Sequence, residues 1–152
     1  MELIKVTESH LQSMMEWFPD QKALKDWAGP GFRYPYDEVT FREDLNLGQL
    51  VSRALVSDGG ELMGFGQFYS RLGRCHLGRL VVNPGCRGQG VVDELIGQLA
   101  ALGMPALRTT ECSLFVLQHN SVAVHAYQRN GFEQTDYPEE SPMDNCIYMV
   151  KR

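Results

Sequence analysis

The stretch from Val81 to Val92, VVNPGCRGQGVV, carries residue types whose spacing suits the binding of an anion. Two β-branched residues run into Asn-Pro, and Arg87, Gly88, Gln89 and Gly90 then stand directly before a helical pattern. A helix start offers unpaired N–H groups, glycines let oxygen atoms approach them, and an arginine adds a charged fork of donors. Phosphate capture is one interpretation, and a glycine-rich turn that caps a buried strand is the other.

Two common phosphate motifs do not match this stretch. No Gly-Lys-Ser/Thr follows the glycines, so the segment is not a Walker loop. The third position of a G-x-G-x-x-G reading is Asp93, and no suitable acidic residue anchors a dinucleotide, so a Rossmann unit fits poorly.

The order of the expected elements predicts an α+β (mixed α/β) fold in one domain, residues 1–152, with helices flanking a largely antiparallel sheet that has one parallel central pairing. Asp58-Gly59-Gly60 indicates a hairpin between two of the strands, and Thr40 with Glu43 has capping-box spacing. Gly103 and Pro105 are typical of a helix end. We expect strands at 3–6, 51–57, 61–70, 74–82, 108–116, 132–137 and 146–150, and helices at 9–17, 40–47, 92–103 and 121–130, the last capped by Ser121, with residues 26–36 irregular.

Composition excludes several classes of function. A net charge of −5 argues against nucleic acid, which demands basic patches. The four cysteines form no CxxC pair and no cluster with histidine at zinc spacing, which predicts free thiols in a reducing compartment and no metal. No segment approaches the roughly 20 apolar residues that span a bilayer. We therefore expect a cytoplasmic protein without membrane contact.

Two segments together resemble the GNAT superfamily of acetyl-CoA-dependent N-acetyltransferases. The first resembles the acetyl-CoA-binding pattern [QR]-x-x-G-x-[GA], which Arg87 to Val91 fit; Val92 departs, because the family usually has Gly or Ala there. The second, NSVAVHAYQRNGF, resembles the later pattern N-x-x-A-x-x-x-Y-x-x-x-G-F, with its named positions at Asn120, Ala123, Tyr127, Gly131 and Phe132.

The resemblance implies a GNAT-like acyl-CoA N-acyltransferase fold with a mostly antiparallel, twisted sheet of six or seven strands. It implies transfer of an acetyl group from acetyl-CoA, as cosubstrate, to a primary amine of a small molecule or peptide by direct attack. A non-catalytic acyl-CoA-binding or sensing module on the same fold is the alternative. Nothing in the motifs decides between a monomer and a homodimer.

By the same resemblance, the cofactor is held by main-chain groups of Leu80, Val81, Val82, Arg87, Gly88, Gln89, Gly90, Val91 and Val92. Asn120 either binds the pantetheine arm or caps its helix. Tyr127 is the expected general acid, with a role as a core aromatic as the alternative reading.

The expected base is His76, which strict strand alternation places on the same face as Gly78, Leu80 and Val82. Glu111 or a chain of water molecules is the alternative. Trp27, Phe32 and Tyr34 either form an aromatic wall that binds the acceptor amine by cation–π contact or pack the irregular segment onto the sheet.

Overall fold

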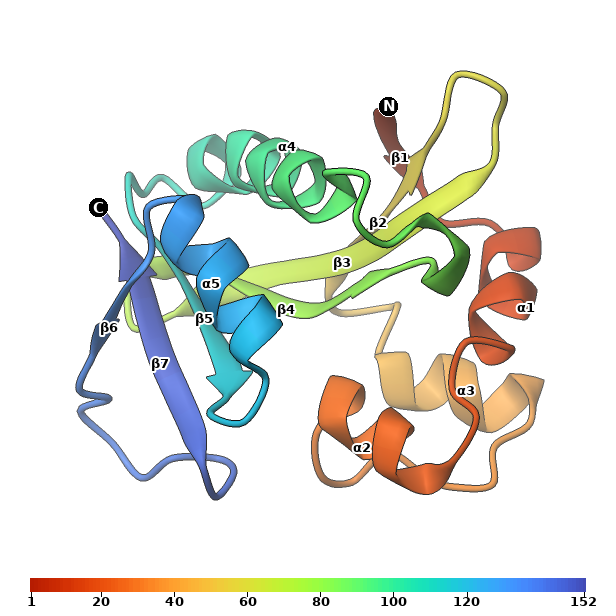
Figure 1. Cartoon of the computed structure of the whole chain (residues 1–152), viewed down its shortest axis with the longest axis horizontal. Coiled ribbons are helices and arrows are strands. Elements are labelled where there is room, and N and C mark those ends of the chain that lie inside the picture. Colours follow the sequence, from red (N-terminus) through yellow and green to blue (C-terminus); the bar gives the residue numbers. More distant parts are fainter.

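The computed structural model describes residues 1–152, and its centre is a seven-stranded sheet (Figure 1). The strands are β1 (Glu2–Lys5), β2 (Val51–Val56), β3 (Leu62–Arg71), β4 (Arg74–Val82), β5 (Cys112–Leu117), β6 (Glu133–Thr135) and β7 (Cys146–Lys151). They lie in the order β1-β2-β3-β4-β5-β7-β6, and only β4 and β5 are parallel. The mixed, mostly antiparallel sheet with one parallel central pairing is confirmed.

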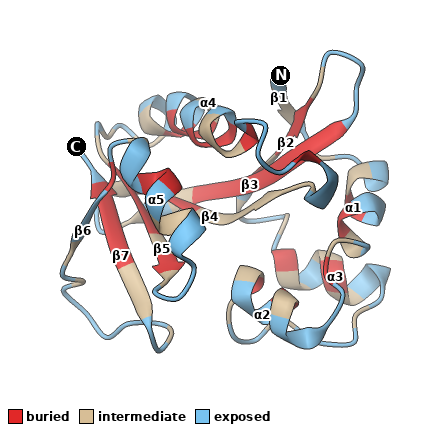
Figure 2. Cartoon of the chain, viewed as in Figure 1, coloured by how far each residue is buried: buried red, intermediate tan, exposed pale blue.

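Five helices cover the sheet in two groups: α1 (Glu8–Met15), α2 (Gln21–Ala28), α3 (Glu38–Leu45), α4 (Val91–Ala106) and α5 (Ser121–Arg129). The first three pack on one face with Ala54 and Phe65, and they form a core of their own. The other two pack on the opposite face, where residues of β3, β4 and β5 build the larger core (Figure 2). None of the helices combines the length and apolar character needed to cross a membrane.

One helix and the starts of two others differ from the sequence predictions. Helix α2 was not predicted; it begins where the Asp20 side chain accepts a hydrogen bond from the Ala23 amide (2.8 Å), so irregular structure starts only at Gly29. Helix α3 begins at Glu38, because Asp37 rather than Thr40 is its cap. Helix α5 is capped by Asn120 and not by Ser121.

The four cysteines are free thiols, as predicted. Cys75 and Cys112 lie opposite each other in the β4–β5 pair, and both are buried. Their mutual hydrogen bond and burial raise the pKa of the Cys75 thiol, so it packs as a small apolar group.

Helix α4 passes through Gly103 and Pro105, and the predicted end at Gly103 is therefore wrong. That glycine serves close packing instead: a Cβ there would lie 2.6 Å from Cys75 Sγ and 3.0 Å from a ring carbon of Phe68. Gly66 in β3 does the same from the sheet side, where a Cβ would lie 2.4 Å from a methyl carbon of Leu99. Helix and sheet thus approach so closely that a Cβ at either position would require neighbouring side chains to move.

Replacement of Gly103 by alanine tests this contact. We expect Gly103→Ala to lower the free energy of unfolding by about 1–3 kcal/mol, because overpacking outweighs the gain in helix propensity. Gly97→Ala is the matched control on the same helix, since a Cβ there meets no atom within 4 Å. It should raise the stability by up to about 1 kcal/mol. Urea denaturation measures both, and equal effects of the two variants would contradict the packing role.

Candidate active site

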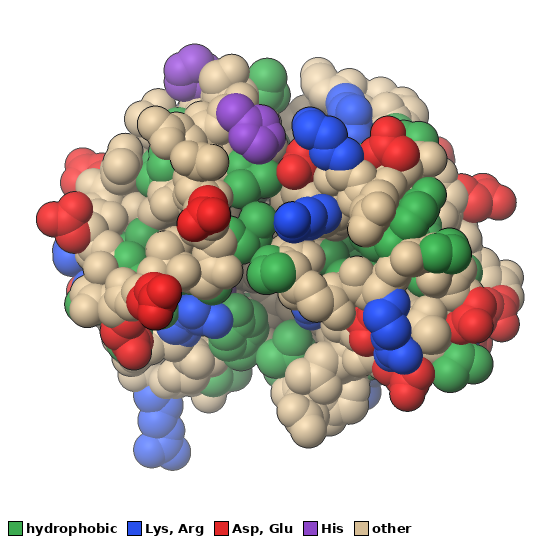
Figure 3. Space-filling model, turned by 90° about the horizontal axis from the view of Figure 1, so that it is seen from below, with side chains coloured by type: hydrophobic (Ala, Val, Ile, Leu, Met, Phe, Trp, Pro, Cys, Tyr) green, Lys and Arg blue, Asp and Glu red, His purple; other side chains and the backbone are tan.

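The parallel pairing of β4 with β5 ends halfway along the strands. The register joins Cys75 to Cys112, His76 to Ser113 and Leu77 to Leu114, and then stops although both strands continue. The second half of β4 is accordingly only half-buried, whereas most of β3 is buried (Figure 2). Viewed from the side opposite α4, the surface is hollowed between the half that carries α1–α3 and the half that carries β5–β7 (Figure 3).

A β-bulge at Arg79 lies where the two strands part. The β3–β4 register shifts between the Phe65 and Gln67 pairs, and Arg79 takes the left-handed conformation (φ 48°). The extra residue reverses the alternation along β4. Leu80 and Val82 pack in the core under α4, while His76 faces the other side of the sheet. The prediction that His76 shares a face with Leu80 and Val82 is therefore wrong.

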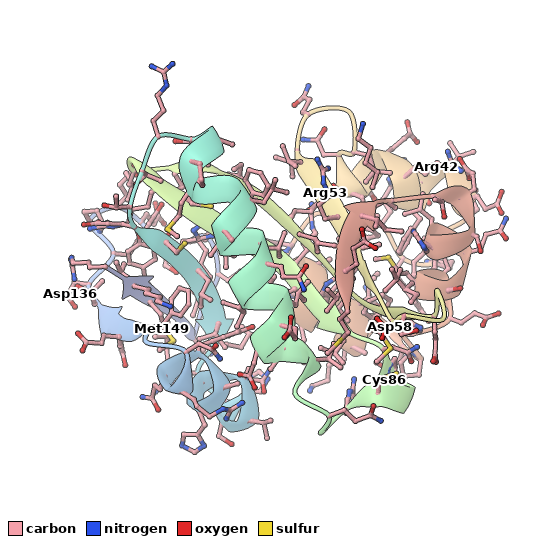
Figure 4. All side chains as sticks on the ribbon, turned by 90° about the horizontal axis from the view of Figure 1, so that it is seen from above. Arg42, Arg53, Asp58, Cys86, Asp136 and Met149 are labelled. Atoms are coloured by element: carbon pink, nitrogen blue, oxygen red, sulfur yellow. The ribbon has the colours of Figure 1, made fainter.

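The loop between β4 and α4 presents a row of unpaired amides. No main-chain N–H from Arg87 to Asp93 donates a hydrogen bond within the protein. Gly88 and Gly90 have φ values of 79° and 74°, and Gly90 stands at the helix N-cap without any side-chain cap. In Figure 4, which looks down on α4, this N-terminal end lies beside the turn that carries Cys86. This amide row has the donors and the dipole of an anion site.

Two side chains beside the amide row also bear on anion binding. Val92 packs its side chain against the core under α4, which leaves its amide in the row. The Asp93 carboxylate, in the first turn of α4, accepts hydrogen bonds from Asn130 Nδ2 (2.6 Å) and Arg129 (3.2 Å) on α5. The positive Arg129 offsets the negative charge that Asp93 would otherwise bring to the site.

Tyr127 lies on α5 in the core under α4 and is 8% exposed. Burial raises the pKa of its phenol to about 12, so the hydroxyl stays protonated through the neutral range. This hydroxyl has no hydrogen-bonding partner in the protein, yet it is not among the atoms sealed from solvent. The side chain of Asn120 caps α5 by accepting a hydrogen bond from the Ala123 amide (3.2 Å). Helix capping was one of the two roles predicted for this residue.

His76 is 2% exposed, and its Nδ1 lies 2.8 Å from Ser113 Oγ. Burial and, to a smaller degree, the charge of Arg71 lower the pKa of His76 to about 3, so the imidazole is neutral and a weak proton acceptor. Glu111 precedes β5 at the closed end of the β4–β5 pair and binds Arg74 (2.7 Å). It therefore lies away from the place where the strands part.

The three aromatic residues predicted at the acceptor site do not form one wall. Trp27 stacks on Phe18 (4.4 Å between ring centroids) and packs near Phe32 (5.9 Å), both as part of the smaller core. Tyr34 is 41% exposed and contacts only Tyr36 among the aromatic rings (6.2 Å). A cavity of about 220 Å³ next to Phe32 lies between α2 and the loop that follows it, rather than at the parting of β4 and β5.

Sequence reasoning missed Arg79. Its carbonyl accepts a hydrogen bond from the Trp27 indole (2.9 Å), and its guanidinium lies in the half-buried face below β4. One feature of the sequence could have indicated its importance: a charged residue stands within the apolar run of a strand that was expected at the centre of the sheet. The structure shows no group of three or more histidine, cysteine or acidic residues arranged to hold a metal ion.

Comparisons with known proteins bear on this geometry. The model of the acetyltransferase (GNAT) family matches residues 11–132. The fold is similar to that of the PaiA N-acetyltransferase from Thermoplasma acidophilum in complex with coenzyme A, with a TM-score of 0.69 and 21% identity over 99% of this chain and 98% of that one. It is also similar to that of spermidine N-acetyltransferase from Vibrio cholerae in complex with CoA and spermine, with a TM-score of 0.74 and 17% identity over 98% and 93%.

An acetyltransferase from Agrobacterium tumefaciens strain C58 shows the same fold, with a TM-score of 0.73 and 15% identity over 99% of this chain and 89% of the other. At these low identities the solved structures show a shared fold only. The family model, in contrast, spans most of the chain and includes both motifs. The parted central strands and the open amide row agree with that match. The chain belongs to the GNAT family of acetyltransferases.

Proposed function

We propose that this protein transfers the acetyl group of acetyl-CoA to a primary amine of a small molecule or peptide. The observation that carries the proposal is the row of unpaired amides from Arg87 to Asp93, which follows in the chain the half of β4 that is not paired with β5. A diphosphate satisfies such donors, and the open edge of a strand satisfies an extended amide-containing arm. Coenzyme A has both parts, and two structures of similar fold are complexes with it.

In this proposal the amides of Arg87–Val92 bind the diphosphate and the main chain of Leu80–Val82 binds the pantetheine arm. The opening between β4 and β5 admits the arm from the α4 face, so the thioester lies near the bulge. We also assign Asn120 to the pantetheine arm, because it follows the end of β5 in the chain, at the start of α5. Trp27 and Phe32 limit the opposite face, from which the amine approaches.

The reaction needs one group to take a proton and one to supply it. The amine nitrogen attacks the carbonyl carbon, a C–N bond forms, the C–S bond breaks, and the thiolate receives a proton. We assign the donor role to Tyr127, whose hydroxyl lacks a partner in the protein. Because its pKa is about 12, it remains a donor at any physiological pH. A hydrogen bond to the departing sulfur is its main contribution, since full transfer is uphill by about 1.4 kcal/mol per unit of pKa difference.

We assign the removal of the amine proton to water in the open groove rather than to His76. A base must hold the proton at least briefly, and a buried imidazole with a pKa of about 3 does so poorly. The ring is further engaged by Ser113 and lies between Tyr69 (5.2 Å) and Phe115 (4.8 Å). This environment suits a packing residue that needs one hydrogen bond.

Binding measurements test the cofactor part of the proposal. We expect isothermal titration calorimetry to show CoA binding, and pantetheine, which lacks the diphosphate, to bind at least about 100-fold more weakly because charge-assisted bonds to the amide row are lost. NAD is the matched control, since it has a diphosphate but no pantetheine arm. Equal affinity for CoA and pantetheine, or no binding of CoA, would contradict the proposal.

Removal of the Tyr127 hydroxyl tests the donor. We expect Tyr127→Phe to reduce kcat by about 10²–10⁴-fold, as general acids commonly contribute, with the affinity for CoA unchanged. Thiol release from acetyl-CoA measures the rate. Tyr36→Phe is the control, because that phenol packs on Phe41 in the smaller core and donates its hydrogen bond to the Met15 carbonyl. Unchanged turnover in Tyr127→Phe would remove the residue from the mechanism.

The buried state of His76 makes stability depend on pH. Its pKa is about 3 in the folded chain and near 6.5 in the unfolded one, so between these values the unfolded chain binds the extra proton. The free energy of unfolding therefore falls as the pH drops below 6.5. His76→Gln keeps a hydrogen-bonding group for Ser113, and its free energy of unfolding should fall by about 2 kcal/mol less than that of the parent between pH 7.5 and 5.0.

Urea denaturation at the two pH values measures this difference, and His125→Gln, at an exposed position of α5, is the control. An identical pH dependence in His76→Gln and the parent would refute the buried neutral state. The same variant separates water from His76 as the base: we expect kcat at pH 8 to stay within about tenfold, and a larger loss would return the base role to His76.

A further inference from the structure

The guanidinium of Arg79 lacks the partners that burial requires. Its Nε is sealed from solvent and has no hydrogen bond, the only buried side-chain polar atom in this state. One terminal nitrogen donates to Gln67 Oε1 (3.1 Å) and, at 3.5 Å, to the Leu45 carbonyl, and Phe32 lies under the group at 5.8 Å. No carboxylate lies within ion-pair distance of it; Asp44, the acid near enough to raise its pKa, is bound to Arg33 (2.9 Å).

A second arginine on the same face is in a similar position. Arg71 donates to the hydroxyls of Tyr69 (3.2 Å) and Tyr137 (3.1 Å) and lies over the ring of Phe115 (5.1 Å), again without a carboxylate. The Tyr69 phenol lies close enough to both arginines to affect their pKa values. The titratable groups around the two arginines are thus tyrosines, the neutral His76 and, near Arg79, the Asp44 carboxylate, which is already bound to Arg33.

This arrangement is costly in a protein whose net charge is −5. Five other arginines, Arg33, Arg42, Arg74, Arg129 and Arg152, are ion-paired, so acidic partners are plentiful elsewhere on the chain. Loss of water around a guanidinium without a paired anion is strongly unfavourable, and burial here lowers the pKa of Arg79. A ligand that brings its own anion removes this penalty.

The place of Arg79 indicates which ligand that is. It sits at the bulge where β4 leaves β5, on the face of α1–α3, whereas the amide row and α4 lie at the other face. The phosphates of the cofactor therefore have a separate site. An anion at Arg79 belongs to the molecule that enters from the groove side, and a guanidinium fork matches a carboxylate best.

We propose that the acceptor is an amine that carries a carboxylate, an amino acid or a similar aminocarboxylate, and that Arg79 binds this carboxylate. The proposal rests on the proposed function and names its substrate class. Arg71 adds positive potential from the same face. Nearby positive charge also disfavours the ammonium form of the amine, which makes loss of its proton easier where no basic side chain stands by.

A matched acceptor panel tests the substrate class with the whole protein. We would measure thiol release from acetyl-CoA with lysine, lysinamide and cadaverine, which share an amine but differ in the carboxylate, with the corresponding series from other amino acids, and with spermine. We expect kcat/KM to be at least about 100-fold higher for the best carboxylate-bearing acceptor than for its amide, because a buried charge is otherwise left unpaired.

Substitution of Arg79 then connects the preference to this side chain. Arg79→Gln should raise the KM of the preferred acceptor at least about tenfold, leave the KM of acetyl-CoA unchanged and abolish the preference over the amide; Arg79→Lys should restore part of it. Arg108→Gln removes the same charge from an exposed position without side-chain hydrogen bonds and is the control.

A thermal melt accompanies each variant and shows that it is folded at the assay temperature. A purely structural Arg79 would lower the melting temperature of Arg79→Gln and leave its acceptor preference unchanged, whereas we expect the preference to be lost in the folded variant. Faster turnover of spermine or cadaverine than of any carboxylate-bearing acceptor would overturn the inference and leave the acetyltransferase proposal standing. Absence of CoA binding would overturn the proposed function itself, and this inference with it.

Discussion

The conformation of one backbone residue, Arg79, decides how the central strands are used. Its left-handed φ adds a residue to β4 opposite β3, and the Trp27 indole holds the carbonyl in that position. Beyond this point the side chains of β4 exchange faces, and beyond Leu77 the strand has no pairing with β5. A single irregularity therefore separates a paired sheet, which supplies stability, from an open strand edge, which supplies main-chain donors and acceptors.

Two places around the unpaired half of β4 attract negative charge, one on each face of the sheet. The helix start at Gly90 offers amides and a dipole, and Arg129 and Asn130 bind the nearby Asp93 carboxylate and so reduce its effect on an incoming anion. The opposite face offers guanidinium groups that tyrosine hydroxyls and rings surround. Both places favour negative charge, although the chain as a whole is acidic. Local arrangement, rather than net charge, thus determines which molecules the site attracts.

Sequence patterns predicted the elements whose signals are local. Apolar alternation located the strands, and Asp58-Gly59-Gly60 indicated the hairpin between β2 and β3. The glycine loop, together with the later segment from Asn120 to Phe132, indicated the family. The bulge was not predictable in this way, because register depends on the partner strand, and strict alternation then put His76 on the wrong face. The predicted helix end at Gly103 was wrong for a similar reason, because a glycine needed for close packing looks the same in the sequence as one that ends a helix.

The glycines at 66 and 103 have a further consequence. A Cβ at either position would come within 3 Å of side-chain atoms across the interface between α4 and the sheet, so close packing restrains the helix there. The amide row lies at the start of this restrained helix. The binding of an anion to these amides therefore requires less ordering of the chain than binding to a free loop would.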